Sequence, residues 1–381
     1  MKIKLLSLAL LASALIGQSA VADINIGVIL PLTGPASGLG IPAKNGIALW
    51  PKMINGEKLN VIILDDASDP TTGTKDARRL TSEDKVDILI GSVATPPAVA
   101  IADEPVELKA ETKTVQISLS PVPLPPGKDN WTFRLPQSNT VMSYAVVEHM
   151  KKHNIKTVGF LGYTDAYGES WLKEFTEVAG KAGIKVVATE RFERKDTSVT
   201  GQALKIAAAK PDAVLIVASG SGAAMPHKEI VARGYMGAIY QTHAAATRDL
   251  MRLGGKDVEG AFVVSGPCVI AEQLPNSHPS KKMAIEFVTQ YEKVYGTGSR
   301  NQFAGHAYDA SIVLQKIIPQ ALQKAKPGTP EFRDALRVAL ETMGTTTLSH
   351  GTIKYTTKDH WGYTNDTGVI LKVVNGDWKV E

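Results

Sequence analysis

The feature that most constrains this chain is a repeated alternation of short apolar runs with helix-forming segments. It begins at residues 23–45, where residues 24–30 form a nearly continuous apolar run, typical of a parallel strand buried on both faces. A loop rich in Gly and Pro follows over residues 31–40 and leads into a predicted helix over residues 41–54. In open α/β sheets, ligands bind where strand carboxyl ends meet such loops. The pattern therefore predicts an α/β fold with a ligand site near this loop.

The same alternation continues twice over. Three more strands complete a first set, predicted at residues 59–64, 86–91 and 114–119 and separated by helices at 71–84 and 98–111. After residues 131–136 a second set begins with a helix at 140–153, followed by strands at 157–161, 185–189, 213–217, 238–241 and 261–264 with helices between them. Two doubly wound lobes, each a mostly parallel sheet covered by helices, are expected from this pattern.

The remainder of the chain changes character. Three long helices are predicted at residues 281–295, 303–325 and 330–343, followed by β-like runs at 351–355, 369–374 and 378–380 around an Asn375-Gly376 turn. Such a tail has too little core to fold alone, so we expect it to pack on the earlier lobes. The predicted lobes are residues 23–138 with 267–349, and 139–266 with 350–381. Three crossovers of this kind form a hinge, and a hinge makes a cleft that can close on a ligand.

The first 22 residues have the composition of an export signal. Lys2 and Lys4 precede an apolar core over residues 5–16, and small residues at 20–22 provide a cleavage site before Asp23. A lipid anchor would need a cysteine at residue 23, and the only cysteine is Cys268. We therefore expect a protein free in the periplasm, folded without disulfides.

Length and charge exclude several classes of protein. The 381 residues suit two domains better than one. The formal charge is +4, and removing Lys2 and Lys4 leaves +2, with no basic cluster that would mark a nucleic-acid surface. No other apolar run approaches the ~20 residues that span a membrane. We expect a monomer that needs no cofactor or metal.

Three motifs have a functional reading that the sequence does not favour. The segment GLGIPA at residues 38–43 matches a dinucleotide fingerprint, but seven residues separate it from the end of the strand. The segment SGSG at residues 219–222 lacks the Gly that a nucleophile elbow places two residues before its Ser. His149 and His153 lie one helical turn apart, as in a metal site, but no third ligand follows, so cations at a helix C-terminus are the better reading.

The chain resembles periplasmic solute-binding proteins of ABC importers, of the leucine/isoleucine/valine-binding family. The resemblance spans nearly the whole chain after the signal and rests on segments at fixed order and spacing: IG and PLTG within 26–34, DDASDP at 65–70, DILIGS at 87–92, YGE at 167–169 and EG at 259–260. It implies the type I periplasmic binding fold, with two Rossmann-like lobes joined by three crossovers. It also implies a receptor that delivers its ligand to an inner-membrane permease and is not an enzyme.

The resemblance further implies positions for ligand-binding residues. Thr95 stands where the family places a hydroxyl that receives the ligand carboxylate. Backbone amides of the loop over residues 118–122, which includes Ser118, Ser120 and Pro121, assist it. Tyr167 matches the aromatic residue of the second lobe that closes over the ligand. These neutral donors suit a bound carboxylate.

Other positions depart from the family pattern. The acidic residue that holds the α-ammonium group of an amino acid is replaced by His243, and an imidazole cannot substitute for that carboxylate. A tyrosine is replaced near Ser219 and Ser221, and an aromatic residue of the first loop becomes Leu39. Tyr163 and Phe262 are candidate ring contacts.

The retained and altered positions predict a pocket that binds a small aromatic carboxylate of the benzoate, hydroxybenzoate or phenylpropanoid kind. Ser219, Ser221 and His243 are the candidates to hold a ring hydroxyl. The alternative is a branched-chain or other apolar amino acid bound by the same kind of receptor. Two remoter alternatives are a ligand-sensing subunit and a cleft hydrolase, for which Ser221 and His243 lack an identifiable orienting acid.

Overall fold

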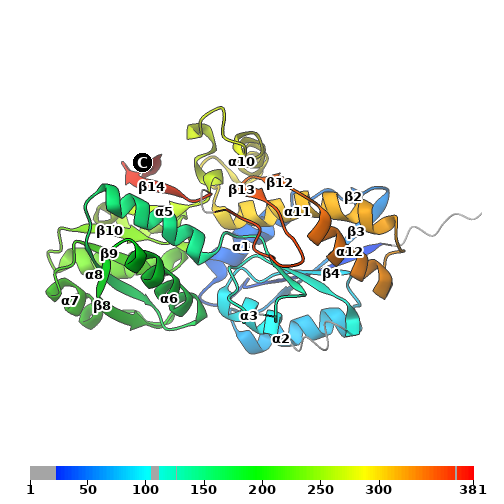
Figure 1. Cartoon of the computed structure of the whole chain (residues 1–381), viewed down its shortest axis with the longest axis horizontal. Helices are drawn as coiled ribbons and strands as arrows, with labels where there is room; N and C mark the ends of the chain where they lie inside the picture. Colours follow the sequence, from blue (N-terminus) through cyan, green and yellow to red (C-terminus); the bar gives the residue numbers. More distant parts are fainter. Residues whose placement is uncertain (1–22, 104–110, 126, 365–366) are drawn as a thin grey trace, which may run out of the picture.

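The computed structural model describes residues 23–103, 111–125, 127–364 and 367–381, so the predicted export signal lies outside the described residues. These residues form two α/β lobes side by side (Figure 1). The first lobe is drawn in blue, cyan and orange, and the second in green with a red edge. Within the described residues, every helix is too short or too polar to cross a membrane.

The first lobe contains a six-stranded sheet in the order β2-β3-β1-β4-β5-β6. All neighbours pair in parallel except β2, which pairs with β3 in the antiparallel direction. The strands are β1 (Ile24–Leu30), β2 (Met53–Ile54), β3 (Glu57–Asp65), β4 (Ile88–Gly91), β5 (Val115–Ser118) and β6 (Thr132–Arg134). Strands β1, β4 and β5 are almost wholly buried, which explains their continuous apolar runs.

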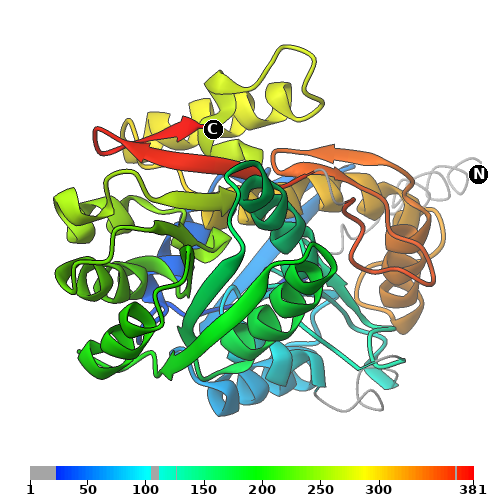
Figure 2. The ribbon, with the colours of Figure 1, turned by 60° about the vertical axis from the view of Figure 1, so that its left-hand side comes forward.

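The second lobe repeats this arrangement in a seven-stranded sheet of order β15-β14-β11-β10-β9-β7-β8. Its parallel strands are β7 (Thr157–Tyr163), β8 (Lys185–Phe192), β9 (Ala213–Val217), β10 (Ala238–Gln241) and β11 (Phe262–Ser265). The antiparallel strands β14 (Val369–Val374) and β15 (Asp377–Val380) extend this sheet beyond β11 (Figure 2). In the turn between them Asn375 and Gly376 both have positive φ, as predicted for an Asn-Gly hairpin.

Helices cover both sheets. The helices that precede residue 266 are α1 (Ser37–Ile47), α2 (Pro70–Arg78), α3 (Thr95–Asp103), α5 (Asn139–Lys152), α6 (Ala166–Lys181), α7 (Thr200–Ala208), α8 (Ala224–Ala232) and α9 (Arg248–Gly254). The tail adds α10 (Lys281–Tyr295), α11 (Gln302–Leu322), α12 (Pro330–Thr342) and a small ribbon of β12 (Thr346–Leu348) with β13 (Gly351–Ile353). Single turns lie at η1 (Arg79–Glu83), η2 (Gly220–Ala223), η3 (His243–Ala245), η4 (Gly255–Val258) and η5 (Pro267–Gln273).

The tail packs back on both lobes, which confirms that expectation. Helix α11 is buried along most of its length against α1 and α12. The indole nitrogen of Trp50 donates a hydrogen bond of 2.8 Å to the carbonyl of Ala307.

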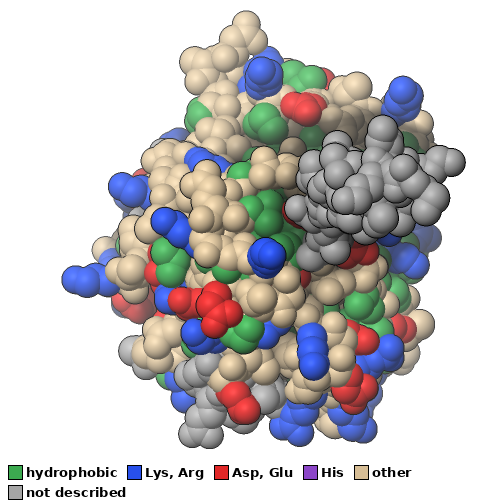
Figure 3. Space-filling view, turned by 90° about the vertical axis from the view of Figure 1, so that its right-hand side faces the viewer, with side chains coloured by type: hydrophobic (Ala, Val, Ile, Leu, Met, Phe, Trp, Pro, Cys, Tyr) green, Lys and Arg blue, Asp and Glu red, His purple; other side chains and the backbone are tan. Residues whose placement is uncertain are grey.

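Figure 3 views the molecule from the end that lies on the right of Figure 1, where basic and acidic side chains are interspersed.

Helix α1 begins at Ser37, four residues earlier than predicted. In the structure, the amides of Leu39 and Gly40 already bond to the carbonyl of Ala36. Gly40 allows this, because a Cβ atom there would overlap the carbonyl of Pro31. Gly40 of the GLGIPA segment therefore serves close packing inside a helix, whereas a Cβ atom on Gly38 would meet only Asp249 Oδ2, at 3.7 Å.

The third crossover needs revision. The sequence predicts this crossover at residue 350, yet residues after 350 still pack on strand β6 of the first lobe. The hydroxyl of Tyr355 donates to the carbonyl of Arg134 (2.7 Å), and the His360 ring stacks on Phe133 at 3.9 Å. We therefore propose a crossover between Trp361 and β14. The boundaries near 138 and 266 stay predictions, and the strands that flank each of them belong to different sheets.

The close approach of α1 to α11 generates a stability prediction. A Cβ atom on Gly46 would overlap the carbonyl oxygen of Ala304 and lie 3.1 Å from the Ala307 Cβ. We expect G46A to lower the free energy of unfolding by roughly 1–3 kcal/mol through overpacking. The matched control is G180A on the open face of α6, where a Cβ atom meets nothing within 4 Å. That variant should gain about 0.5–1 kcal/mol, because Ala favours a helix. Urea unfolding would measure both, and equal changes would contradict the packing argument.

Candidate ligand-binding cleft

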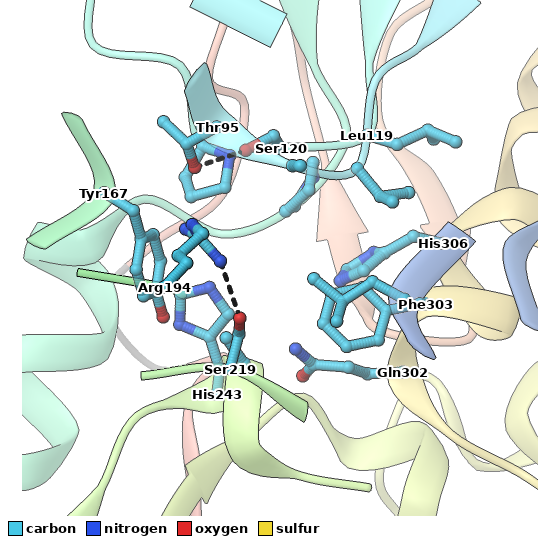
Figure 4. Close-up of a pocket in the computed structure, with 16 residues that line it drawn as sticks. Thr95, Leu119, Ser120, Tyr167, Arg194, Ser219, His243, Gln302, Phe303 and His306 are labelled. Atoms are coloured by element: carbon cyan, nitrogen blue, oxygen red, sulfur yellow. Dashed lines mark hydrogen bonds between the residues drawn. The ribbon is translucent and has the colours of Figure 1, made fainter. Parts of the chain in front are cut away.

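One cavity lies between the lobes, at the carboxyl ends of their parallel strands. Its empty volume is about 360 Å³. Strand β1 lies between β3 and β4 in the first sheet, and β7 lies between β8 and β9 in the second. Ligands of open α/β sheets bind at such a reversal of strand order. The lining residues come from both lobes and from α11 (Figure 4): Leu39, Val93, Ala94, Thr95, Leu119, Ser120, Pro121, Pro136, Tyr167, Arg194, Ser219, His243, Ala244, Gln302, Phe303 and His306.

The first lobe contributes a pair of hydroxyl groups. Thr95 is the first residue of α3, and its Oγ1 lies 2.7 Å from the Oγ of Ser120 in a buried hydrogen bond. The loop that carries Ser120 is fixed from behind, because the Ser118 hydroxyl donates to the Ser120 carbonyl at 2.9 Å. The start of a helix attracts negative charge, so this wall suits an anion.

The second lobe contributes a cation, Arg194, which follows strand β8. Its Nε donates to Asp165 Oδ2 at 2.5 Å, and its Nη1 donates to Ser219 Oγ at 2.8 Å. The guanidinium lies 4.2 Å from the centre of the Tyr163 ring. Asp165, Ser219 and the Tyr163 ring therefore fix its position, and Figure 4 shows it between Thr95 and Ser219.

His243 forms the floor of the cavity beside Tyr167 and Trp171. Burial, with a smaller contribution from nearby His350, lowers the pKa of His243 to about 3, so the ring is neutral at physiological pH. Its Nδ1 is buried without a hydrogen-bond partner among the described residues. The Tyr167 hydroxyl is occupied, since it donates to Thr242 Oγ1 at 2.8 Å. His243 thus lines the cavity as a neutral imidazole whose Nδ1 has no partner among the described residues.

Helix α11 closes the third side. Its first turns present Gln302, Phe303 and His306 to the cavity (Figure 4). Gln302 Nε2 and His306 Nδ1 are buried without partners among the described residues. Burial lowers the pKa of His306 well below its ordinary value, so this imidazole is also neutral. The side offers an aromatic face together with polar atoms that lack a protein partner.

The charges of the cavity are one-sided. Arg194 is the only permanently charged residue among the described lining residues, and none of them is Asp or Glu. Asp165 neutralises one face of the guanidinium from outside the lining. A carboxylate can bind here, whereas an ammonium group would find no carboxylate in the lining.

Seven of the predicted site residues line the cavity: Leu39, Thr95, Ser120, Pro121, Tyr167, Ser219 and His243. Their contact with a ligand stays a prediction. Three others do not line it. Ser118 lies behind Ser120, as described. Ser221 is exposed in the turn η2. Phe262 is the first residue of β11, at the opposite end of that strand from the cavity, and it packs against Tyr240 (5.1 Å between ring centres) and His149.

Sequence reasoning missed Arg194 and the three residues of α11. We expected β8 to end at residue 189, but the strand continues to Phe192. Arg194 therefore lies two residues beyond the end of β8. The positions just after the ends of the other strands are where the sequence predicts ligand contacts. Gln302, Phe303 and His306 share one face at the start of α11, and only the packing of α11 on α1 brings that face to the cleft.

The comparison with known proteins identifies the family. A family model described as "Periplasmic binding protein" matches residues 23–376. The chain belongs to the periplasmic binding protein family. This is a family of solute-binding proteins rather than enzymes, and solved members share its type I fold, such as the type 1 protein from Bordetella pertussis (TM-score 0.81, 20% identity, 94% of this chain and 100% of that one).

Several members are similar over most of their length. The Leu/Ile/Val-binding protein homolog 3 of Brucella melitensis is 26% identical over 300 residues, which cover 75% of this chain and 77% of the relative. An extracellular ligand-binding receptor from Rhodopseudomonas palustris HaA2 is 43% identical with a TM-score of 0.91, covering 94% of this chain and 100% of the other. A solute-binding protein of an ABC transporter from R. palustris, solved in complex with benzoate, shares the fold at 20% identity (TM-score 0.78, 94% and 95% coverage).

The neutral, buried His243 generates a prediction on acid stability. Its pKa is about 3 in the folded protein and about 6.5 in the unfolded chain, so only the unfolded chain gains the proton as the pH falls through 6.5. At pH 5 this costs the folded protein about 2 kcal/mol. We expect the His243→Gln variant to lose about that much less stability than the wild type between pH 7.5 and 5, measured by urea unfolding. The exposed His153→Gln is the control, and an identical pH profile for the two variants would contradict the assignment.

Proposed function

We propose that this protein is the exported solute receptor of an ABC importer and binds a small aromatic monocarboxylate between its lobes. The observation that carries the proposal is Arg194, the only permanent charge among the described residues of a cavity that includes no acidic side chain. A cognate inner-membrane permease would accept the ligand from the loaded receptor.

The carboxylate would lie between Arg194 and the Thr95–Ser120 pair. The cation and the hydroxyl pair belong to opposite lobes, so one anion can contact both. Charge-assisted hydrogen bonds of this kind are roughly twice as strong as neutral ones. Binding would thus stabilise the arrangement in which the lobes approach each other, which is the state a permease could recognise.

The body of the ligand would be apolar and flat. Leu39, Leu119 and Phe303 present hydrocarbon or aromatic surface to the cavity. An amino acid would place its ammonium group in the same cleft, and a buried ammonium without a carboxylate partner is costly. The benzoate complex of the R. palustris protein shows that this fold accommodates such an acid.

A ring hydroxyl would meet His243. The neutral imidazole keeps an unpartnered Nδ1 in the cavity, which can accept from or donate to a phenol according to its tautomer. Of the other two predicted hydroxyl partners, Ser219 already accepts from Arg194 and Ser221 does not line the cavity. We therefore assign the ring hydroxyl to His243 alone.

The second candidate ligand is a branched-chain amino acid. The observation that favours it is the name of the relatives, such as the Leu/Ile/Val-binding protein homolog of Brucella melitensis. Both candidates imply the same receptor role, and they differ in whether the pocket needs an acidic partner for the amine.

A ligand panel separates these alternatives. Thermal unfolding of the purified protein would be followed with benzoate, 4-hydroxybenzoate, p-coumarate, leucine and the uncharged isostere benzamide. A ligand at a hundredfold excess over its dissociation constant adds about 2.7 kcal/mol of stability. We expect the aromatic acids to raise the midpoint and benzamide and leucine to leave it unchanged. A shift with leucine alone would make the protein an amino-acid receptor and refute the aromatic acid.

The role of Arg194 has its own test. We expect R194Q to weaken binding of the aromatic acid by about 10- to 100-fold, since a hydrogen bond to a charged group contributes about 1.5–3 kcal/mol. The matched control is R191Q, which removes an arginine from the same strand end that pairs with exposed Glu169 outside the cavity. Titration calorimetry would measure both variants. Equal affinity in R194Q and R191Q would show that the carboxylate binds elsewhere.

A further inference from the structure

A cluster on the second lobe, outside the ligand cavity, has the composition of a metal site: His149, His153 and Glu381. His149 and His153 lie in the last turn of α5 and at its end, spaced i and i+4 as in helical zinc ligands. The sequence shows no third ligand near them. The sequence alone therefore favours the interpretation of His149 and His153 as cations at a helix C-terminus.

The fold supplies the third ligand from the other end of the chain. Strand β15 returns along β14, and the amide of Glu381 donates to the Ile370 carbonyl at 3.0 Å. The hairpin lies next to α5 in Figures 1 and 2. One ligand atom each from His149, His153 and Glu381 lie within 4.8 Å of one another.

His149 is already oriented for a ligand. Its Nδ1 lies 2.9 Å from the hydroxyl of Tyr240, and its Nε2 is buried without a partner among the described residues. Metal-bound histidines characteristically use their second ring nitrogen in such an outer hydrogen bond, which fixes the ring. His153 and Glu381 are exposed, so both side chains can move the short distance that coordination requires.

We propose that His149, His153 and Glu381 bind a divalent first-row cation of the zinc class, with water completing the coordination. Two imidazoles and one carboxylate match the ligand preferences of Zn²⁺, Ni²⁺ and Cu²⁺, whereas Mg²⁺ and Ca²⁺ prefer all-oxygen sites. None of the three residues lines the ligand cavity, so the site is independent of the proposed function.

The surroundings set the strength of the site. The positive charges of Lys152 and Lys372 act on the His149 ring, where they disfavour added positive charge. The Lys372 ammonium lies 5.1 Å from the centre of the Phe262 ring. The rings of Tyr240 and Phe262 wall the buried side of His149. Two nearby ammonium groups oppose a dication and one carboxylate favours it. The site should therefore bind more weakly than one with two carboxylates.

A second cluster, His306, Asp309 and His350, also meets the distance condition for a metal. Its carboxylate is occupied, because both Asp309 oxygens accept hydrogen bonds from Ser349 and one of them also meets the His350 ring at 3.0 Å. These bonds would have to break for a metal to enter. We therefore assign the cation to the α5 cluster, and the variants below distinguish the two.

The test is calorimetric titration of zinc chloride into the untagged, chelator-treated protein in a buffer that does not bind zinc. We expect one Zn²⁺ per chain. H153A and E381Q should each weaken binding at least tenfold, and neither removes a buried side chain. The matched control is E148Q, which removes an exposed carboxylate of the same helix that pairs with Lys151 and should leave zinc affinity unchanged.

Two results would overturn the proposal. One is the absence of zinc binding in the wild-type protein. The other is binding that H153A and E381Q both leave unchanged, which would place the metal elsewhere, for example at His306 and His350. Circular dichroism would verify that the variants are folded. Retained binding of the organic ligand in H153A would show that the two sites are separate.

Discussion

Parallel pairing of β1 with β3 and β4, and of β7 with β8 and β9, is the constraint on which the cleft depends. Parallel strands end at the same edge of a sheet, so the loops that follow them gather there. In each lobe the wall of the cavity begins within a few residues of a strand end: Thr95 after β4, Ser120 after β5, Arg194 after β8 and His243 after β10. The start of α11 forms the third side. Two such edges that face each other make the site.

Asp165 connects the secondary structure of the second lobe to its electrostatics. One carboxylate oxygen caps α6 by accepting from the amides of Tyr167 and Gly168, and the other holds Arg194. The same residue therefore starts the helix that carries Tyr167 and offsets part of the charge of the cation. A guanidinium compensated on one side can remain in a nearly dry cleft and still attract an anion from the other.

A buried network joins segments that lie far apart in the sequence. Asp309 of α11 binds Ser349 and His350 of the returning chain, while His350 also lies 3.1 Å from the Cys268 sulfur. The His350 carbonyl accepts from Gln137 at 2.8 Å. These residues come from α11 and from segments near residues 137, 268 and 350, so the bonds fix how those segments lie relative to one another. The His306 ring, which lines the cavity, stacks on the His350 ring with 3.7 Å between the ring centres. The network therefore contacts the wall of the cavity.

The sequence by itself determined the two α/β lobes, the tail that returns to them and seven of the cavity-lining residues. It could do so because a buried parallel strand, an amphipathic helix and an Asn-Gly turn each leave a local pattern in the chain. Only the tertiary structure decided that Arg194, Phe303 and His306 line the cavity, that Phe262 does not, and that Glu381 lies beside His149. The reason is physical: these contacts join segments far apart in sequence, and the packing of α11 and of the β14–β15 hairpin leaves no signature in the residues that it brings together.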